Sequence, residues 1–143
     1  MSNPFETALP RQSANYLPLS PISFLTRSAL VNQQDTSLIH GERIWTWADT
    51  YIRCRRLASA LSKKGIGKGD TVSVMAPNIP AIFEAHFGVL MTGAVLNTLN
   101  IRLEAETLSY IFEHAETKVL LTDREFSSVI KQVLSNIRQK IIV

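Results

Sequence analysis

The residues that most suggest phosphate chemistry are three glycines interleaved with a lysine at residues 65–70, GIGKGD. Glycine-rich loops bind phosphates where a strand runs into the loop and a helix leaves it, because backbone N–H groups and the helix N-terminus then converge on the anion. The order here is reversed, since a helical pattern precedes the glycines and an apolar strand pattern follows them. Lys68 is followed by Gly69 rather than by Ser or Thr, and the glycine spacing does not fit a dinucleotide fingerprint either. We therefore interpret Gly65 as the left-handed residue that ends a helix, and the two later glycines as the turn into a strand.

A second place for ligand chemistry is the carboxyl edge of the parallel sheet that the chain is expected to form, because ligands of such sheets bind beyond the carboxyl ends of the strands. Asn78 is interpreted there as the N-cap of the following helix. Asn97 and Asn100 are interpreted as turn residues, since asparagine stabilises turns through its own side chain. The segments that reach this edge are residues 76–78, residues 97–100 and Asp123.

Asp123 raises a sharper alternative, because a strand that ends in aspartate is where a receiver domain carries its phosphorylated residue. Such a domain also needs an acidic pair after its first strand and a lysine after its last, which hold Mg²⁺ and the phosphoryl group. Residues 76–78 read Ala-Pro-Asn and hold no carboxylate. The favoured interpretation is that Asp123 is the N-cap of a helix that begins at Arg124. A receiver-like phosphorylation module stays an alternative.

The histidines and the other acidic residues form no catalytic or metal-binding pattern. His40, His86 and His114 are too scattered for a metal site by local spacing, and no carboxylate pair accompanies any two of them. Glu84 and His86 are the strongly polar residues of an otherwise apolar helix, yet residues two apart on a helix point to different sides. No Gly-x-Ser-x-Gly nucleophile elbow occurs. The sequence therefore assigns no catalytic, cofactor-binding or metal-binding residue.

Local signals predict the elements of the first half of the chain. Residues 37–40 and 43–45 flank a Gly-Glu pair at 41–42, which indicates a hairpin. The stretch TWAD at 46–49 has the form of a capping box and predicts the start of a helix. An apolar stripe at helical spacing follows and puts Cys54 in the core rather than in a reactive position. The stripe is formed by Trp47, Tyr51, Cys54, Ala58 and Leu61.

From residue 71 onward, strand and helix patterns alternate with short links. This alternation implies β-α-β units and a mainly parallel sheet with helices on its faces, so the predicted fold class is α/β. The helix expected at residues 80–91 is so apolar that it should be largely buried. The expected strands are residues 71–75, 94–96 and 118–122, and the other helices start near residue 104 and at about residue 126.

The domain organisation follows from the two ends of the chain. Four of the six prolines fall in the first 21 residues, so residues 1–21 are expected to be an extended N-terminal lead-in. A short helix at residues 22–31 should open an α/β domain that takes in residues 22–143. Residues 141–143, Ile-Ile-Val, have the character of another core strand, so we expect that domain to be the opening piece of something larger. An open sheet edge there would favour self-association or pairing with another chain.

Composition is typical of a folded protein from a reducing compartment. The 143 residues are 45% apolar, which is enough for the core of one domain. Cys54 is the sole cysteine, which excludes an intrachain disulfide and suits the cytoplasm. The first residues lack the basic and apolar regions of a signal peptide, and no apolar run approaches the ~20 residues of a membrane span. We expect a cytoplasmic protein with no membrane span.

The net charge of +3 does not indicate a nucleic-acid partner. The main basic cluster is interpreted as a solvated helix face, because aromatic residues do not interleave with it. That cluster consists of Arg53, Arg55, Arg56, Lys63, Lys64 and Lys68.

Taken in order, several short stretches resemble the adenylate-forming acyl-activating enzymes, and within them the acyl-CoA synthetases. Each stretch alone is weakly specific, whereas their order and spacing together are specific. The resemblance covers nearly the whole chain from about Ile22 onward. The stretches are TWAD at 46–49, GI at 65–66, GDTVSV at 69–74 with Asn78, GAV at 93–95 with Asn100 and RL at 102–103, and KVLLTD at 118–123.

This resemblance implies an activity for a complete relative, which would activate a carboxylate with ATP and Mg²⁺ and pass the acyl group from an acyl-adenylate to coenzyme A. The resemblance also implies a phosphate loop rich in Ser, Thr and Gly, a Tyr-Gly-x-Thr-Glu segment, a ribose-binding aspartate, a hinge and a C-terminal lysine. None of these occurs in the 143 residues, so no catalytic residue is carried over and no cofactor is expected to bind this piece alone. Leu99 stands where many relatives have proline, which resembles the fatty-acid branch.

The function expected from the sequence is therefore the N-terminal part of an ATP-dependent carboxylate–CoA ligase, with a fatty acid as substrate. The 143 residues alone should be inactive, because positioning ATP requires groups that they do not contain. A non-enzymatic α/β interaction module is the alternative from another class.

Overall fold

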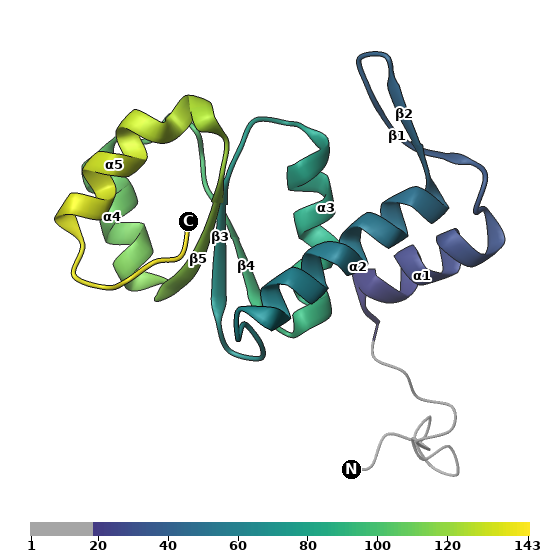
Figure 1. The fold of residues 1–143 in the computed structure, drawn as a ribbon, viewed down its shortest axis with the longest axis horizontal. Coiled ribbons are helices and arrows are strands. Elements are labelled where there is room, and N and C mark those ends of the chain that lie inside the picture. The colour runs from purple at the N-terminus through teal and green to yellow at the C-terminus, as the bar shows by residue number, and fades with distance from the viewer. Residues whose placement is uncertain (1–18) are drawn as a thin grey trace, which may run out of the picture.

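The computed structural model describes residues 19–143, so residues 1–18 of the expected N-terminal lead-in lie outside the described residues. The described part contains a three-stranded sheet with helices on both faces and a separate two-stranded hairpin (Figure 1). The α/β class expected from the sequence is confirmed.

Helix α1, Pro21–Val31, starts at a serine cap followed by a proline. The Ser20 Oγ accepts a hydrogen bond of 3.3 Å from the Ile22 N–H, and proline suits the first turn because its missing N–H would have no partner there. The helix expected at residues 22–31 is thus confirmed. Pro21 belongs to this helix rather than to the lead-in.

Strands β1, Thr36–His40, and β2, Arg43–Thr46, form the expected antiparallel hairpin. Gly41 opens its turn with a φ of +60°, a conformation that glycine adopts without steric cost. The hairpin projects from the start of α2 and lies away from the sheet (Figure 1). Ile39 and Ile44 face each other across the two strands, and both are exposed.

Helix α2, Trp47–Lys63, starts at the predicted capping box. The Thr46 Oγ1 accepts a hydrogen bond from the Asp49 N–H, and the Asp49 Oδ2 accepts one from the Thr46 N–H, each at 3.1 Å. The hydrogen bond from the Thr46 N–H is the largest cause that lowers the pKa of Asp49 below its ordinary value. Cys54 is fully buried in the predicted stripe, and burial raises the pKa of its thiol to about 11. The thiol is a packing group, as predicted.

The sheet has the order β4-β3-β5, and both neighbouring pairs are parallel. Because β4 and β5 lie on opposite sides of β3, the two right-handed crossovers place helices on both faces. Helices α2 and α3 cover one face, and α4 and α5 cover the other (Figure 1). The strands are β3, Thr71–Met75, β4, Val95–Thr98, and β5, Thr117–Thr122, and the helices are α3, Pro80–Gly88, α4, Ala105–His114, and α5, Ser127–Asn136, with 3₁₀ turns η1, Leu90–Thr92, and η2, Arg124–Phe126.

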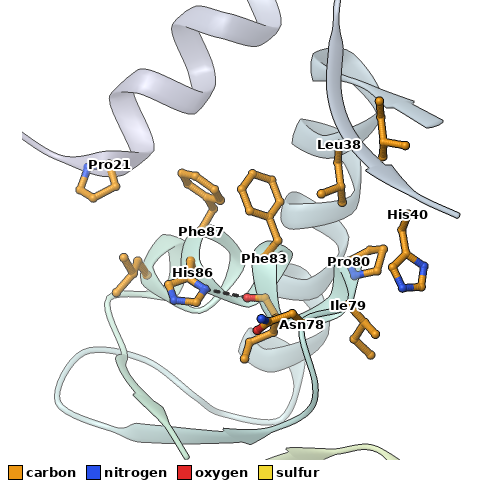
Figure 2. A pocket seen from close by; sticks show the side chains of 12 residues that line it. Pro21, Leu38, His40, Asn78, Ile79, Pro80, Phe83, His86 and Phe87 are labelled. Carbon is orange, nitrogen blue, oxygen red and sulfur yellow. Dashed lines mark hydrogen bonds between the residues drawn. The ribbon is translucent and has the colours of Figure 1, made fainter. Parts of the chain in front are cut away.

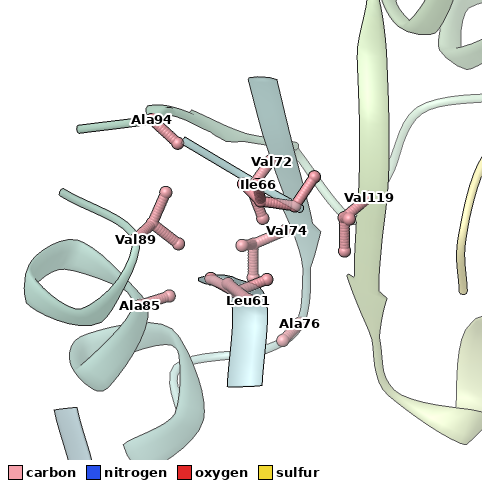
Figure 3. Close-up of a cluster of buried hydrophobic side chains, with 9 residues drawn as sticks. All are labelled: Leu61, Ile66, Val72, Val74, Ala76, Ala85, Val89, Ala94 and Val119. Carbon is pink, nitrogen blue, oxygen red and sulfur yellow. The ribbon is translucent and has the colours of Figure 1, made fainter. Parts of the chain in front are cut away.

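Each face of the sheet has its own apolar core. Val72 and Val74 of β3 point into the core beneath α2 and α3, whereas Met75 belongs to the core beneath α4 and α5. Figure 3 shows the first core, formed by Leu61, Ile66, Val72, Val74, Ala76, Ala85, Val89, Ala94 and Val119. The second is formed by Met75, Leu99, Leu108, Phe112, Leu120, Ile130 and Val133.

A short polar ladder joins the three strands of the sheet. The Asn97 Nδ2 donates to the Ser73 Oγ at 3.0 Å, and the Ser73 Oγ lies 2.7 Å from the Thr117 Oγ1. Ser73 and Thr117 are buried, so these bonds satisfy groups that water does not reach. The interpretation of Asn97 as a turn residue is wrong, because β4 extends to Thr98 and includes it.

The last residues pair with the outer edge of β5. The Ile142 N–H donates to the Lys118 carbonyl at 3.0 Å, and the Ile142 carbonyl accepts from the Leu120 N–H at 2.8 Å. This is an isolated parallel bridge between Ile142 and Val119 rather than a strand. The expectation of self-association through this edge stays a prediction.

Candidate functional site

Three cavities meet where β3 leads into α3, at the carboxyl edge of the sheet. Asn78 and Ile82 line the first cavity and the third, and Ile79 lines the first and the second. Ala76 lines the second and the third. The cavities therefore gather at the edge where parallel sheets bind their ligands.

The first cavity, which we call the α3 groove, has a volume of about 600 Å³ and an almost wholly apolar lining. The rings of Phe83 and Phe87 point from α3 into the space below α1 and beside the hairpin (Figure 2), with centroids 5.4 Å apart in a T-shaped arrangement. Both rings are half-buried, so the expectation that this helix is largely buried holds only for its inner side. Pro21, Leu38, Ile39, Ile79, Ile82 and Leu90 supply most of the remaining apolar lining.

The second cavity lies between the carboxyl ends of β3 and β5 and has a volume of about 320 Å³. The connection after β3 leads to one face of the sheet and the connection after β5 to the other, so this cavity sits at the topological switch point. Glu84 and Asp123 are its two acidic lining residues. Neither carboxylate is free, because Glu84 pairs with Arg53 and the Asp123 Oδ1 accepts a hydrogen bond of 3.2 Å from the Glu125 N–H.

Asp123 therefore caps the turn η2 rather than a full helix. The predicted role as an N-cap is confirmed, with α5 beginning only after η2. Asp123 is thus used structurally at the position where a receiver domain would carry its phosphoryl group.

The third cavity, about 540 Å³ and open to solvent, lies at the ends of β3 and β4. The Asn100 Oδ1 accepts a hydrogen bond of 2.9 Å from the Arg102 N–H, which confirms Asn100 as a turn residue. The prediction for Asn78 is wrong. Ile79 occupies the N-cap position, and α3 begins without a side-chain cap. Asn78 instead stays exposed on the rim between this cavity and the α3 groove.

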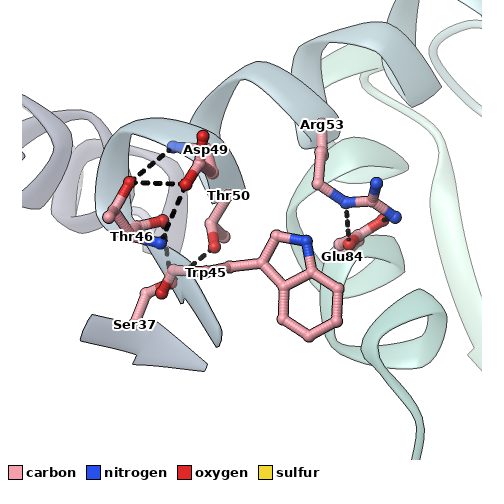
Figure 4. A network of polar contacts seen from close by, with 7 residues as sticks. All are labelled: Ser37, Trp45, Thr46, Asp49, Thr50, Arg53 and Glu84. Atoms are coloured by element: carbon pink, nitrogen blue, oxygen red, sulfur yellow. Dashed lines mark hydrogen bonds and ion pairs between the residues drawn. The ribbon is translucent and has the colours of Figure 1, made fainter. Parts of the chain in front are cut away.

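A polar network fixes the position of α3 relative to α2 and the hairpin (Figure 4). The Arg53 Nε and Nη2 donate to the two carboxylate oxygens of Glu84 at 2.5 and 3.2 Å, and the guanidinium lies 5.8 Å from the ring centroid of Trp45. The hydrogen bond to Glu84 raises the pKa of Arg53. Arg53 is exposed, as the predicted solvated basic face requires, but its guanidinium also pairs with Glu84, which lies 31 positions away in sequence.

Glu84 and His86 point to different sides of α3, as their spacing predicts. Glu84 is buried, whereas His86 is exposed and its Nδ1 lies 2.7 Å from the Ile82 carbonyl oxygen. The two residues do not form a pair.

The glycine-rich turn at residues 65–70 is closed by its own hydrogen bonds. Gly65 has a φ of +80°, and the Ile66 N–H donates back to the Leu61 carbonyl at 3.1 Å, so the helix ends in a Schellman motif as predicted. The Gly67 N–H donates to the Asp70 Oδ2 at 2.8 Å. These donors are occupied, and the turn lies at the amino end of β3, so it does not fit a phosphate group.

The part of the chain that the structure describes shows no group of three His, Cys, Asp or Glu side chains that could hold a metal ion. Within the same residues, no helix combines the length and the apolar composition needed to cross a bilayer.

Fold and cavities together define an α/β protein with three cavities at the carboxyl edge of its parallel sheet. Residues 25–143 match the AMP-binding enzyme family, and the chain belongs to this family. The resemblance to the acyl-CoA synthetases is confirmed by the relatives.

Two of the most similar relatives are CoA ligases from plants. The chain is 50% identical over 132 residues to the peroxisomal acetate/butyrate–CoA ligase AAE7 of Arabidopsis thaliana, which covers 92% of this chain and 23% of that protein. It is 47% identical over 126 residues to the peroxisomal trans-cinnamate:CoA ligase of Petunia hybrida, which covers 88% of this chain and 22% of the relative. The chain thus spans about a quarter of the length of the curated relatives it matches.

Among solved structures, the anthranilate CoA ligase AuaEII in complex with anthranoyl-AMP superposes with a TM-score of 0.80 at 23% identity, over 88% of this chain and 25% of that one. At this identity the likeness concerns the fold. The described α/β arrangement is therefore one that also occurs inside a larger CoA ligase.

Sequence reasoning missed the α3 groove and the Arg53–Glu84 pair. The groove had one signal, the strongly apolar composition of α3, which predicted a largely buried helix. The pair had none, because nothing in the local spacing links α2 to α3.

Proposed function

We propose that the chain is part of an ATP-dependent carboxylate–CoA ligase that works through an acyl-adenylate. The observation that carries this proposal is the 50% identity to an acetate/butyrate–CoA ligase over 92% of the chain. In this assignment residues 22–143, together with Pro21 of α1, are the opening part of the large N-terminal domain. The parallel sheet then contributes its carboxyl edge to the wall of a larger site.

The described residues do not fit ATP, Mg²⁺ or coenzyme A on their own. The Ile66 and Gly67 N–H groups of the glycine turn are already bonded, the turn lies at the amino end of β3, and the described side chains include no metal-binding cluster. We therefore assign no step of the reaction to a residue of this chain. The expected result is that the 143 residues alone show no carboxylate-dependent exchange of pyrophosphate into ATP. Clear turnover in that assay would contradict the prediction that the 143 residues alone are inactive.

For the substrate we propose a fatty acid at the short end of the range. Support comes from the acetate and butyrate named for one relative and from Leu99, which stands where many family members have proline. An aromatic acid is the second candidate, since another relative is a trans-cinnamate:CoA ligase. Adenylation by the full polypeptide that carries these residues, compared for butyrate, hexanoate and cinnamate, separates the two candidates.

The cellular address is proposed as the cytoplasm, on the basis of the single buried thiol. The peroxisome is the competing address, because the names of both quoted relatives include it. Microscopy of a fluorescent fusion of the full polypeptide distinguishes them. The non-enzymatic interaction module remains the alternative function, and a stable complex without any ligase activity would support it.

A further inference from the structure

Apart from Glu84 and His86, helix α3 consists of apolar residues and glycine, and it presents them on two sides. Its inner side carries Ala85 and Gly88, which are buried against α2 and the sheet. Its outer side carries Ile82, Phe83 and Phe87, which are half-buried and line the α3 groove. Aliphatic and aromatic side chains that gather on the outer side of a helix whose inner side is already packed mark a surface for a covering group.

The shape of the groove is fixed, because polar contacts hold the hairpin that forms one of its walls. The Ser37 hydroxyl bonds to the Thr50 hydroxyl at 2.6 Å, which ties β1 to α2. Arg53 lies between Trp45 of β2 and Glu84 of α3 (Figure 4). The hairpin wall and the floor of the groove are thus joined through one side chain.

The polar groups around the groove do not favour a small carboxylate as its occupant. Small-molecule sites place a few polar groups so that they converge on the ligand. Here His40 and His86 lie on opposite sides of the groove (Figure 2), and the His86 Nδ1 already faces the Ile82 carbonyl. The two aromatic rings instead offer a wide apolar surface of the kind that receives apolar side chains.

We propose that the α3 groove is the docking site for an apolar segment of the polypeptide that forms the remainder of an AMP-binding CoA ligase. This inference rests on the proposed function. The relatives are about four times as long as the matched part, since that part covers 22–23% of them. The structural neighbour AuaEII contains this fold in 25% of its chain, which leaves three quarters to supply the covering segment.

The test uses the complementary part of AAE7, which is the polypeptide left after the segment matched by this chain is removed. The tagged 143-residue chain and the untagged complement are co-expressed, and the complement captured with the tag is measured. Phe83→Asp and Phe87→Asp place a charge in the groove. Ile52→Asp is the matched control, because Ile52 is a half-exposed apolar residue on α2 that does not line the groove.

The unchanged chain should capture the complement in a stable complex. Each groove substitution should lower the capture by about tenfold, because a charged group would have to be desolvated at the contact. Ile52→Asp should change it by less than about twofold. Circular dichroism of each variant alone establishes that it is folded, and the double variant Phe83→Ala, Phe87→Ala replaces any variant that is not.

Three results would overturn the inference. The first is no capture by the unchanged chain, and the second is equal capture by the groove variants and the control. The third is a dimer of the chain alone that Phe83→Asp dissociates, which would assign the groove to a second copy. Failure of the proposed function looks different: the complex forms through the groove, but it exchanges no pyrophosphate with any carboxylate.

Discussion

The two faces of the sheet are covered by helices of different character. On one face, α4 and α5 turn their apolar residues inward, and Leu108, Phe112 and Val133 have no measurable exposure. On the other face, α3 buries small residues against α2 and leaves the half-buried rings of Phe83 and Phe87 on its outer side. The first face is closed within the described residues, whereas the second ends in a groove.

This difference shows that local amphipathicity reports whether a helix is covered on one side or on both. An amphipathic helix such as α4 needs only the sheet beneath it. Helix α3 packs against α2 and the sheet on its inner side, and the proposed covering segment would supply a second surface on its outer side.

The largest expected effect separates two phenylalanines on the two faces. Phe112→Ala removes a ring with 0% exposure and should lower the free energy of unfolding by about 3–5 kcal/mol. Phe83→Ala removes a half-buried ring from the groove wall and should cost about 1 kcal/mol. Urea unfolding of both variants measures the difference. Equal losses of unfolding free energy would contradict the difference between the two faces, because they would mean that the groove wall is packed as tightly as the closed core.

Several features on both faces of the sheet were predictable because each depends on neighbouring residues. The capping box at Thr46, the helix end at Gly65 and the stripe that includes Leu108 and Phe112 each depend on residues within one or two turns. For such signals the sequence states both the element and the side of it that is buried.

The surroundings of α3 were less predictable for a physical reason. The pattern of α3 has no apolar direction, so it predicts burial without saying against what. Asn78 looked like a cap because of its type, yet Pro80 fixes the first turn so that Ile79 takes the N-cap position. The Arg53–Glu84 pair joins residues 31 positions apart, and only the packing of α2 on α3 brings them together.

Gly88 distinguishes the tightly packed inner side of α3 from its outer side, because it allows the close contact of α3 with α2. A Cβ at this position would lie 2.8 Å from the Leu57 Cδ2 and 2.9 Å from the Cys54 carbonyl oxygen. Gly88→Ala should therefore cost about 1–3 kcal/mol through overpacking, although alanine normally stabilises a helix interior. Gly67→Ala is the control, since its Cβ would meet nothing closer than 4.0 Å, and it should change stability by about 0.5 kcal/mol or less. A stabilising Gly88→Ala would show that the two helices are not tightly packed.

The Arg53–Glu84 pair should contribute less to the free energy of unfolding than the packing at Phe112 or at Gly88. Removing the guanidinium leaves a buried carboxylate without its partner, which typically costs 3–5 kcal/mol for a fully buried pair. The side chain of Arg53 is 43% exposed, so solvent reduces the expected loss for Arg53→Met to about 1–2 kcal/mol. Arg56→Met is the matched control on the exposed face of the same helix and should cost about 0.5 kcal/mol or less. A double-mutant cycle with Glu84→Gln measures the coupling energy between the two side chains. A coupling energy of zero would show that this pair does not help to hold α3 against α2.

The smallest expected effect concerns Asp70, which links the turn before the central strand β3 to Lys118 at the start of β5. The hydrogen bond from Lys118, followed by that from the Gly67 N–H, holds the pKa of Asp70 below its ordinary value. A lowered folded-state pKa means that the ionised carboxylate stabilises the fold at neutral pH. This stabilisation is lost as the pH falls below the ordinary aspartate range, about 4, toward the folded-state pKa. The difference in unfolding free energy between the unchanged chain and Asp70→Asn should therefore narrow on acidification. Lys118→Gln should flatten the same pH dependence, and added salt should shrink it because the pair is near the surface. A difference that stays constant from neutral to acidic pH would show that this bond does not stabilise the link between the turn before β3 and the start of β5.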